Sequence, residues 1–165
     1  MSLHDDMLKI GDQAVATARL LAQLSSRRKN SLLQEMAEEL DARREAIKAA
    51  NAIDMEGGRK AGLSNAMLDR LQLTDARLDA MSKGIRDIVA LKDPVGAKIS
   101  RWIRPNGLVI QKMRVPIGVI GIIYEARPNV TSDAAALCFK TSNAVILRGG
   151  SEAMHSNRAI AAAMQ

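Results

Sequence analysis

The stretch PIGVIGIIYEARPNVTSD, residues 116–133, begins as an apolar run and then changes abruptly to charged residues, proline and asparagine. Its part at residues 117–124 is rich in Ile and Val and too continuous for a strand with one wet face, so we expect a strand that is buried on both faces. In open α/β sheets, ligands bind where strands stop and helices begin. The end of this strand is therefore the first place to look for a functional site.

The segments that follow continue the same pattern. Residues 131–140 predict a helix, residues 144–148 a strand, and residues from about 151 onward a second helix. Strands that alternate with helices in this way are typical of a parallel sheet. We predict an α/β fold, with a helical N-terminal region followed by the start of a Rossmann-like parallel sheet in a three-layer α/β/α arrangement.

The region up to residue 93 is predicted to be mostly helical, because apolar residues recur there at helical spacing. Caps and breakers set the limits of three amphipathic helices. These are residues 7–24; residues 26–51, capped by Ser25 or Ser26 and followed by a stop at Gly57 and Gly58; and the residues after Thr74 up to the break at Asp93 and Pro94.

A β-hairpin is predicted between the helices and the sheet, within residues 101–113. Asn106 and Gly107 lie at its centre, and an Asn-Gly pair readily takes the positive φ angles of tight turns. Apolar residues flank this turn on both sides, which is typical of paired strands.

Composition excludes several classes of protein. The chain of 165 residues is 47% hydrophobic, which is enough for one compact domain or part of one. No apolar run approaches the roughly 20 residues of a membrane span, and the N-terminus lacks the profile of a signal peptide, so we expect a cytoplasmic protein. The single cysteine cannot form an internal disulfide, and His4 and His155 lie too far apart in the sequence to suggest a metal site.

The net charge of +6 does not by itself indicate a nucleic-acid-binding protein. The basic residues are spread among carboxylates, as in DARREAIK, and only one Tyr, one Phe and one Trp are present to stack on bases. A solvated helix face explains this pattern better. A basic balance also suits an enzyme whose cofactor and substrate carry phosphate groups.

Two strand ends are expected to lie beside one crevice, because parallel strands end on the same side of a sheet. These are residues 124–129 and residues 148–151. At the second end, Gly149 and Gly150 would let a ligand approach the backbone, Ser151 could cap the next helix, and Arg148 with free amides would favour an anion such as phosphate. An ordinary Gly-Gly-Ser turn is the alternative.

A dinucleotide at this crevice would have to be held without the glycine fingerprint of ordinary Rossmann domains. The G-x-G-x-x-G pattern is absent, since Gly118 and Gly121 stand too early, inside the predicted strand.

Three ordered pieces of the sequence carry a resemblance to a known family. They are RVPIGV at residues 114–119, EARPNVTSD at residues 125–133, and SNAVILRGGSE at residues 142–152. They resemble the glutamate-5-semialdehyde dehydrogenases, or gamma-glutamyl phosphate reductases, of the aldehyde dehydrogenase superfamily. The EARPNVTSD and LRGGSE variants distinguish this family from the broader superfamily. The resemblance covers nearly all 165 residues and corresponds to the N-terminal part of an NADP-binding domain.

The resemblance implies an activity. It is the NADPH-dependent reduction of L-glutamate 5-phosphate to L-glutamate 5-semialdehyde and phosphate, a step of proline biosynthesis. In the superfamily, a cysteine thiolate displaces phosphate and forms a thioester, which accepts hydride. Cys138 is the only cysteine here, and its place on the helix between the two strands indicates a structural residue. We therefore expect the nucleophile, and the strands that complete the sheet, to lie beyond residue 165, and the 165 residues alone to be inactive.

The resemblance also implies roles for individual residues. Arg148 stands beside the adenosine ribose, where a guanidinium would suit the 2′-phosphate of NADPH. Asn129 resembles the asparagine that stabilises the oxyanion, and Arg127 would bind the substrate or pair with Glu125. The residues assigned to the cofactor are Ile123, Tyr124, Arg148, Gly149, Gly150 and Ser151.

The remaining implications concern partners and alternatives. The hairpin at residues 101–113 resembles the bridging strands that contact a partner subunit in the superfamily, so we expect a homo-oligomer, and glutamate 5-kinase is the protein partner that the family suggests. Two other readings stay open: a non-catalytic interaction module of the same fold, and a related reductase of another acyl phosphate or aldehyde.

Overall fold

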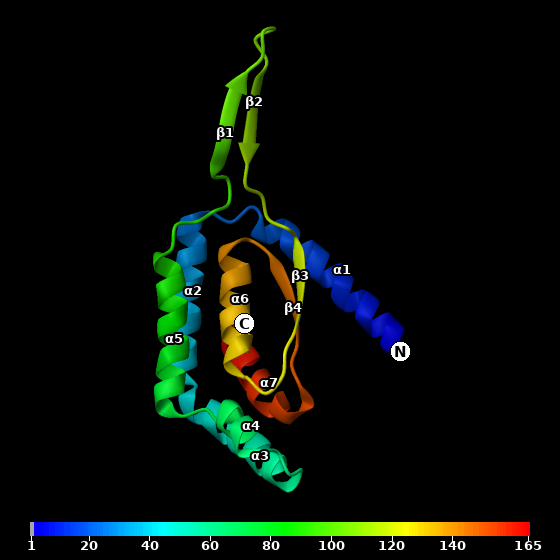
Figure 1. The fold of residues 1–165 in the computed structure, drawn as a ribbon, viewed down its shortest axis with the longest axis vertical. Coiled ribbons are helices and arrows are strands. Elements are labelled where there is room, and N and C mark those ends of the chain that lie inside the picture. Colours follow the sequence, from blue (N-terminus) through cyan, green and yellow to red (C-terminus); the bar gives the residue numbers. More distant parts are fainter. Residues whose placement is uncertain (1) are drawn as a thin grey trace.

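The computed structural model describes residues 2–165, and its elements follow one another in the predicted order of helices, hairpin and sheet (Figure 1). The elements are α1 (Leu3–Leu21), α2 (Ser26–Ala42), α3 (Arg44–Lys60), α4 (Asn65–Leu71), α5 (Asp75–Ala90), β1 (Lys98–Ile103), β2 (Val109–Met113), β3 (Val119–Ile123), α6 (Asn129–Lys140), β4 (Ala144–Arg148), the short 3₁₀ helix η1 (Ser151–Ala153) and α7 (Met154–Ala163).

Side-chain caps begin most of the N-terminal helices. Ser25 and Thr74, both predicted as caps, accept hydrogen bonds from the amides of Arg28 and Arg77 at the start of α2 and α5. Ser64 caps α4 in the same way, although the sequence reading did not include this short helix. Each cap satisfies a backbone N–H that the helix itself leaves unpaired.

The prediction of one helix over residues 26–51 is wrong. The backbone at Arg43 leaves the helical region, with φ −94° and ψ 15°, and divides the segment into α2 and α3. Gly57 and Gly58 were also wrongly predicted as a stop, because α3 continues through both. Gly58 is instead a packing residue: a Cβ atom there would lie 3.0 Å from Leu63 Cδ1.

The main hydrophobic core lies among α2, α5, α6 and α7. Its central side chains, Leu33, Ile85 and Ile160, are completely buried, as is Ala136 of α6 in the same cluster. A separate small cluster joins α3, α4 and η1 through Met55, Leu71 and Ala153. Burial of these apolar side chains is the dominant favourable contribution to folding.

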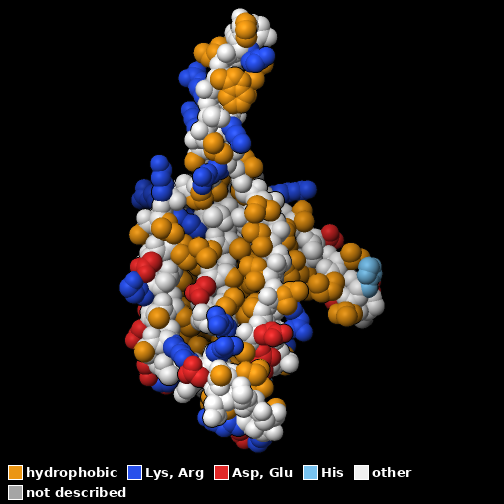
Figure 2. All heavy atoms as spheres, viewed as in Figure 1, with side chains coloured by type: hydrophobic (Ala, Val, Ile, Leu, Met, Phe, Trp, Pro, Cys, Tyr) orange, Lys and Arg blue, Asp and Glu red, His pale blue; other side chains and the backbone are white. Residues whose placement is uncertain are grey.

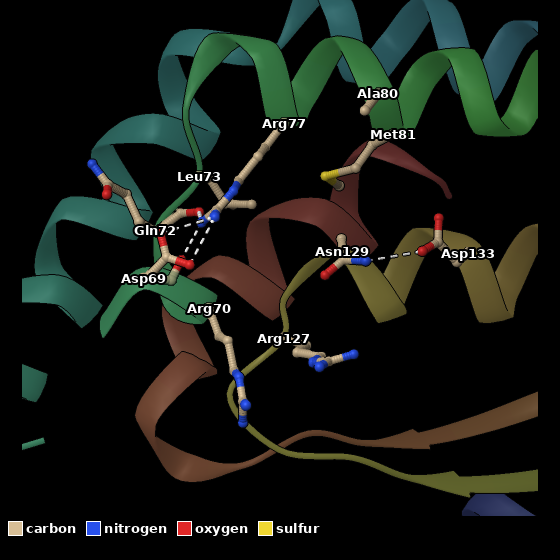
Figure 3. A pocket seen from close by; sticks show the side chains of 10 residues that line it. All are labelled: Asp69, Arg70, Gln72, Leu73, Arg77, Ala80, Met81, Arg127, Asn129 and Asp133. Carbon is tan, nitrogen blue, oxygen red and sulfur yellow. Dashed lines mark hydrogen bonds and ion pairs between the residues drawn. The ribbon is translucent and has the colours of Figure 1, made fainter. Parts of the chain in front are cut away.

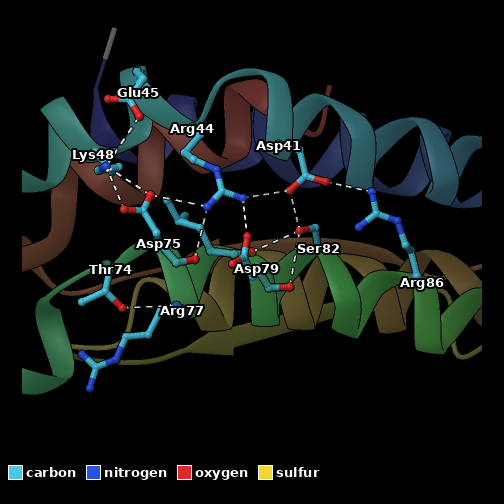
Figure 4. Close-up of polar contacts among 11 residues, drawn as sticks. Asp41, Arg44, Glu45, Lys48, Thr74, Asp75, Arg77, Asp79, Ser82 and Arg86 are labelled. Carbon is cyan, nitrogen blue, oxygen red and sulfur yellow. Dashed lines mark hydrogen bonds and ion pairs between the residues drawn. The ribbon is translucent and has the colours of Figure 1, made fainter.

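Two kinds of polar contact hold the helices in register. At the margin of the core, Asp41 of α2 accepts hydrogen bonds from Ser82 and Arg86 of α5, while Arg44, the first residue of α3, contacts Asp79 of α5 (Figure 4). In the interior, Lys29 is 1% exposed; its Nζ lies 2.6 Å from Asp93 Oδ2 and donates hydrogen bonds. Its two acceptors are the Lys140 carbonyl and the Ser142 hydroxyl.

The hairpin is confirmed. Strands β1 and β2 pair antiparallel with Ile103 opposite Val109, and Gly107 takes a φ of 82° in the turn between them. The hairpin extends away from the rest of the molecule (Figure 1). Apolar residues on it are largely exposed to solvent, namely Ile99, Trp102, Ile103, Leu108, Val109 and Met113.

The sheet is parallel, as predicted, with β3 paired to β4. The prediction that residues 117–124 are buried on both faces is wrong for the described chain, since Ile117 is 82% and Ile123 83% exposed. Within residues 2–165 this parallel sheet consists of β3 and β4 alone, so neither of its outer edges is paired there. Figure 2 shows apolar side chains gathered at the surface over this part of the molecule.

Helix α1 packs against β4 and β3 but buries none of its side chains completely. The amphipathic helix predicted at residues 7–24 is present as α1, whereas the apolar side chains of Met7 and Ile10 are exposed. Among residues 2–165, no helix combines the length and the apolar character that crossing a bilayer requires.

Candidate functional site

The two predicted strand ends lie side by side. Ile123 pairs with Arg148 at the last position of the β3–β4 ladder, and the amide of Tyr124 donates a hydrogen bond of 3.1 Å to the Arg148 carbonyl. The segments that follow the two strands therefore start from neighbouring points at the carboxyl ends of the strands, where α/β folds bind ligands.

A glutamate without a predicted role joins these two segments. Glu152 in η1 accepts a hydrogen bond from the amide of Ala126, in the loop after β3. Gly150 makes room for this carboxylate, since a Cβ atom at residue 150 would lie 2.1 Å from Glu152 Oε1. The acid in the quoted LRGGSE motif was the available signal.

The absence of a side chain at Gly149 leaves room for a second group of polar contacts. Tyr124 and Thr131 share a hydrogen bond of 2.6 Å between their hydroxyls, and Thr131 donates to Asn157 Oδ1 at 3.0 Å. A Cβ atom at Gly149 would lie 2.1 Å from Asn157 Nδ2. The side chains of Asn157 and Glu152 thus occupy the space that a side chain at residue 149 or 150 would take. That packing accounts for the glycines without a ligand, and cofactor binding by Gly149 and Gly150 stays a prediction.

The expectation that Ser151 caps the next helix is wrong. Residues 151–153 form the 3₁₀ helix, which shifts the start of α7 to Met154, and Ser151 makes no side-chain cap. The first amides of α7 are bound by Asp54 of α3, at 3.1 Å from His155 N and 2.7 Å from Ser156 N. This helix start therefore holds a carboxylate of the protein itself.

Arg148, the last residue of β4, provides a cation at this end of the sheet. Its side chain is exposed, donates to the carbonyl of Gly149 and, within residues 2–165, forms no ion pair. Ile123, which pairs with it across the sheet, offers an exposed apolar surface. An exposed guanidinium beside an apolar surface fits a cofactor that carries both a phosphate and a flat ring.

A pocket of about 320 Å³ lies near the loop that follows β3 (Figure 3). Arg127 and Asn129 both line it, whereas the residues predicted to bind the cofactor do not. Its wall includes residues of α4, α5, α6 and two loops: Asp69, Arg70, Gln72, Leu73, Arg77, Ala80, Met81, Arg127, Asn129 and Asp133.

The charges in this pocket are unequally paired. Arg77 donates to both carboxylate oxygens of Asp69, at 3.0 and 3.1 Å. Arg70 and Arg127 form no ion pair or side-chain hydrogen bond with any residue in the described range, so the alternative in which Arg127 pairs with Glu125 does not occur there. Both side chains are exposed.

Asp133 lies one helical turn after Asn129 and accepts a hydrogen bond of 3.0 Å from its Nδ2. Burial raises the pKa of the Asp133 carboxyl, and the bond from Asn129 lowers it by less. Neither Asp133 nor Arg70 was singled out from the sequence. The spacing of four residues between Asn129 and Asp133 was the only signal, because such residues share a helix face.

Cys138 is 7% exposed on α6, and burial raises the pKa of its thiol. Both features disfavour the thiolate and agree with the structural role predicted for this residue. Within residues 2–165, no three His, Cys, Asp or Glu side chains are grouped so that they could hold a metal ion.

Comparison with known proteins identifies close relatives, although no family model matches the chain. A gamma-glutamyl phosphate reductase of Geotalea daltonii is 55% identical over 165 residues, which are 100% of this chain and 40% of the relative. The same enzyme of Moorella thermoacetica is 59% identical over 150 residues, which are 91% of this chain and 36% of the relative. The chain is a homologue of gamma-glutamyl phosphate reductases.

Solved structures agree with this assignment. The gamma-glutamyl phosphate reductase of Thermotoga maritima matches with a TM-score of 0.93 and 44% identity, over 95% of this chain and 38% of that one. A putative aldehyde dehydrogenase of Bacillus subtilis matches with a TM-score of 0.71 and 18% identity, over 97% of this chain and 33% of that one, which shows a shared fold. The chain spans about two fifths of the length of the gamma-glutamyl phosphate reductases that it matches.

Proposed function

We propose that these residues form the cofactor-binding and substrate-facing part of an enzyme that reduces L-glutamate 5-phosphate to L-glutamate 5-semialdehyde and phosphate with NADPH, in proline biosynthesis. The observation that carries this proposal is the 55% identity to a gamma-glutamyl phosphate reductase over the whole chain. The pocket supports it, because Arg127 and Asn129 offer a cation and an amide for an anionic acyl group.

When bound, NADPH would supply the hydride. Arg148 would hold its 2′-phosphate, because a permanently charged guanidinium with no carboxylate partner in the described residues can pair with a phosphate. The exposed face of Ile123, together with Tyr124, Gly149, Gly150 and Ser151, would form the rest of this surface.

Asn129 would stabilise the negative charge that develops on the carbonyl oxygen of the acyl group. Its amide nitrogen carries two N–H groups, and the bond to Asp133 uses one of them. The other N–H can donate to the substrate oxygen, a contribution that is strongest where charge develops in the transition state. The buried Cys138 is unsuited to attack, so we expect the 165 residues alone to lack activity.

The test is an activity assay on the protein expressed from its complete coding sequence. We expect NADPH oxidation that depends on L-glutamate 5-phosphate and, in the reverse direction, NADP⁺ reduction that requires L-glutamate 5-semialdehyde and phosphate together. Asn129→Ala should lower kcat by about 10²- to 10³-fold. NADPH binding without any turnover would instead support a non-catalytic module, and turnover of a different acyl phosphate would support a related reductase.

The family resemblance extends the proposal to assembly and location. The exposed apolar residues of the β1–β2 hairpin support a homo-oligomer in which the hairpin contacts a second subunit. The kinase that makes the acyl phosphate, glutamate 5-kinase, is the partner that this reaction suggests, since an acyl phosphate hydrolyses readily in water. Both proteins would work in the cytoplasm.

A further inference from the structure

Three charged groups in the pocket lack a counter-charge within residues 2–165. They are the guanidiniums of Arg70 and Arg127 and the carboxylate of Asp133. The fourth and fifth charged residues, Asp69 and Arg77, neutralise each other. Figure 3 shows Arg70 and Arg127 on one side of the pocket and the linked pair of Asn129 and Asp133 on the other.

Buried neighbours fix the backbone beside the two arginines. Arg70 precedes Leu71, which is fully buried in the small cluster beneath α4. Arg127 follows Ala126, which is 6% exposed and whose amide is bound by Glu152. The backbone at both arginines is therefore fixed before a ligand binds, and binding has to order only their side chains.

Asp133 is held by α6 on one side and faces α5 on the other. Asn129 donates to its Oδ2, and a Cβ atom added at Gly84 of α5 would lie 3.9 Å from its Oδ1, so this oxygen lies beside a position without a side chain. A half-buried carboxylate with one neutral donor and no cation is poorly compensated for the water it has lost. A cationic group of a ligand would supply the missing interaction.

The charges of the pocket match those of one class of molecule. An α-amino acid with an acyl phosphate on its side chain carries two anionic groups, the carboxylate and the phosphate, and one cationic group, the ammonium. Apart from the paired Asp69 and Arg77, the pocket offers two guanidiniums and one carboxylate, which is the complementary ratio of charged groups. Its volume of about 320 Å³ lies at the lower end of the usual range for small-molecule sites, which suits a ligand of amino-acid size.

We propose that Asp133 binds the α-ammonium group of the substrate while Arg70 and Arg127 bind its two anionic groups, so that the pocket selects an amino acid over its analogue without the amino group. This assignment rests on the proposed function and adds Asp133 and Arg70 as specificity-determining residues. It also explains why a carboxylate lies in a pocket for an anionic substrate: without a cation to bind, Asp133 would only repel that substrate.

The experiment compares two aldehydes in the reverse reaction of the protein made from its complete coding sequence. L-Glutamate 5-semialdehyde carries the amino group and 5-oxopentanoate lacks it; each is oxidised to its acyl phosphate as phosphate bonds to the acyl carbon, a hydride passes to NADP⁺ and a proton is released. We expect the wild-type kcat/KM to favour the amino substrate by about 10- to 100-fold, the value of a hydrogen bond to a charged group. In Asp133→Asn this ratio should fall to within about threefold of unity.

Two matched variants separate this role from a general effect on the pocket. Asp69→Asn removes another carboxylate from the same wall, but one already paired with Arg77, and should leave the ratio of the two substrates unchanged. Arg70→Gln should raise by about 10-fold or more either the KM for both aldehydes, which carry the carboxylate, or the KM for inorganic phosphate, with a smaller change in kcat.

The outcomes distinguish the two proposals. Absence of turnover with either aldehyde in the wild-type protein would overturn the proposed function. Turnover with an unchanged substrate ratio in Asp133→Asn, or with no preference in the wild type, would overturn the role of Asp133 and leave the reaction standing. If Asp133→Asn unfolds early in a thermal scan, Asp133→Ser takes its place, and the inhibition constants of L-glutamate and glutarate as competitive inhibitors are compared instead. A ratio of these constants that is the same in Asp133→Ser and the wild type would also overturn the role of Asp133.

Discussion

Glu152 accepts a hydrogen bond from the backbone amide of Ala126, with 2.5 Å between Oε1 and the nitrogen, and so ties the loop after β3 to the turn after β4. Ala126 has a φ of 45°, in a left-handed region that disfavours residues with a Cβ atom by about 1–2 kcal/mol. The bond helps to hold this conformation, and the conformation in turn sets where the chain continues to Arg127 and Asn129.

Removal of this bond should weaken both stability and substrate binding. Glu152→Ala leaves a buried amide without an acceptor, and we expect a loss of about 1–3 kcal/mol in the free energy of unfolding, together with a higher KM for the acyl phosphate. Chemical denaturation and steady-state kinetics measure the two effects. Glu125→Ala, an exposed change one residue before Ala126, is the control and should stay within about 0.5 kcal/mol of wild type. Equal losses in both variants would rule out a specific role for Glu152.

The buried lysine of α2 should matter far more than a surface lysine. Lys29→Met deletes the partner of Asp93 and leaves that carboxylate uncompensated, so we expect a loss of about 3–5 kcal/mol. Lys83→Met removes an exposed pair with Asp87 and should change stability by about 1 kcal/mol or less. Urea unfolding of the two variants provides the comparison, and a Lys29→Met protein as stable as Lys83→Met would contradict the prediction.

The same ion pair predicts how stability depends on pH. Desolvation is the largest single influence on the pKa of Asp93 and would raise it. Hydrogen bonds from Lys29, Ser26 and the Val95 amide together outweigh desolvation, so the pKa is lowered. A carboxyl whose pKa is lower in the folded state contributes stability above its unfolded pKa of about 3.9, and this contribution is lost as pH falls through the folded value.

Wild-type protein should therefore lose more stability than Asp93→Asn when the pH falls from about 5 to about 2. Thermal unfolding midpoints at a series of pH values measure the difference. Parallel curves for the two proteins would show that Asp93 has the same pKa in both states.

Arg148 should decide the preference for NADPH over NADH. We expect Arg148→Glu to raise KM for NADPH by about 10-fold or more while that for NADH changes little, because only NADPH carries the 2′-phosphate. Steady-state kinetics with both cofactors measure the preference. Arg158→Glu in α7 makes the same charge change at another exposed position and is the matched control. An equal rise in KM for both cofactors would place the effect of Arg148 elsewhere on the cofactor.

The hairpin should control subunit association. Trp102→Asp places a charge among its exposed apolar residues and should reduce the molar mass measured by light scattering to that of a smaller assembly. Ile53→Asp, at a similarly exposed position on α3, should leave the mass unchanged. A Trp102→Asp protein that keeps the wild-type mass would show that the hairpin does not hold the subunits together.

Local features of the fold could be predicted from the sequence. The bounds of β4, the caps Ser25 and Thr74 and the Asn-Gly hairpin all follow from a few adjacent residues, and the structure confirms them. The break at Arg43 could not be predicted, because the apolar periodicity runs through it.

The pocket was predicted only in part for a related reason. Arg127 and Asn129 follow a strand end and resemble a known motif, so sequence reasoning reached them. Arg70 lies 63 positions before Asp133 in the numbering, and only the packing of α4 and α6 around one pocket brings the two residues together. Likewise, the role of Glu152 depends on a contact between two loops that no spacing in the sequence shows.

The small cluster of Met55, Leu71 and Ala153 has a consequence for anyone who recombines this sequence with that of a relative. Ala153 follows Glu152, and Leu71 follows Arg70, so one patch of apolar contacts supports the turn after β4 and the helix that carries Arg70. A crossover placed between α4 and η1 would join halves whose contact surfaces come from different parents. Chimeric proteins should therefore inherit residues 44–71 and 151–153 as a single block, whichever parent supplies the hairpin between them.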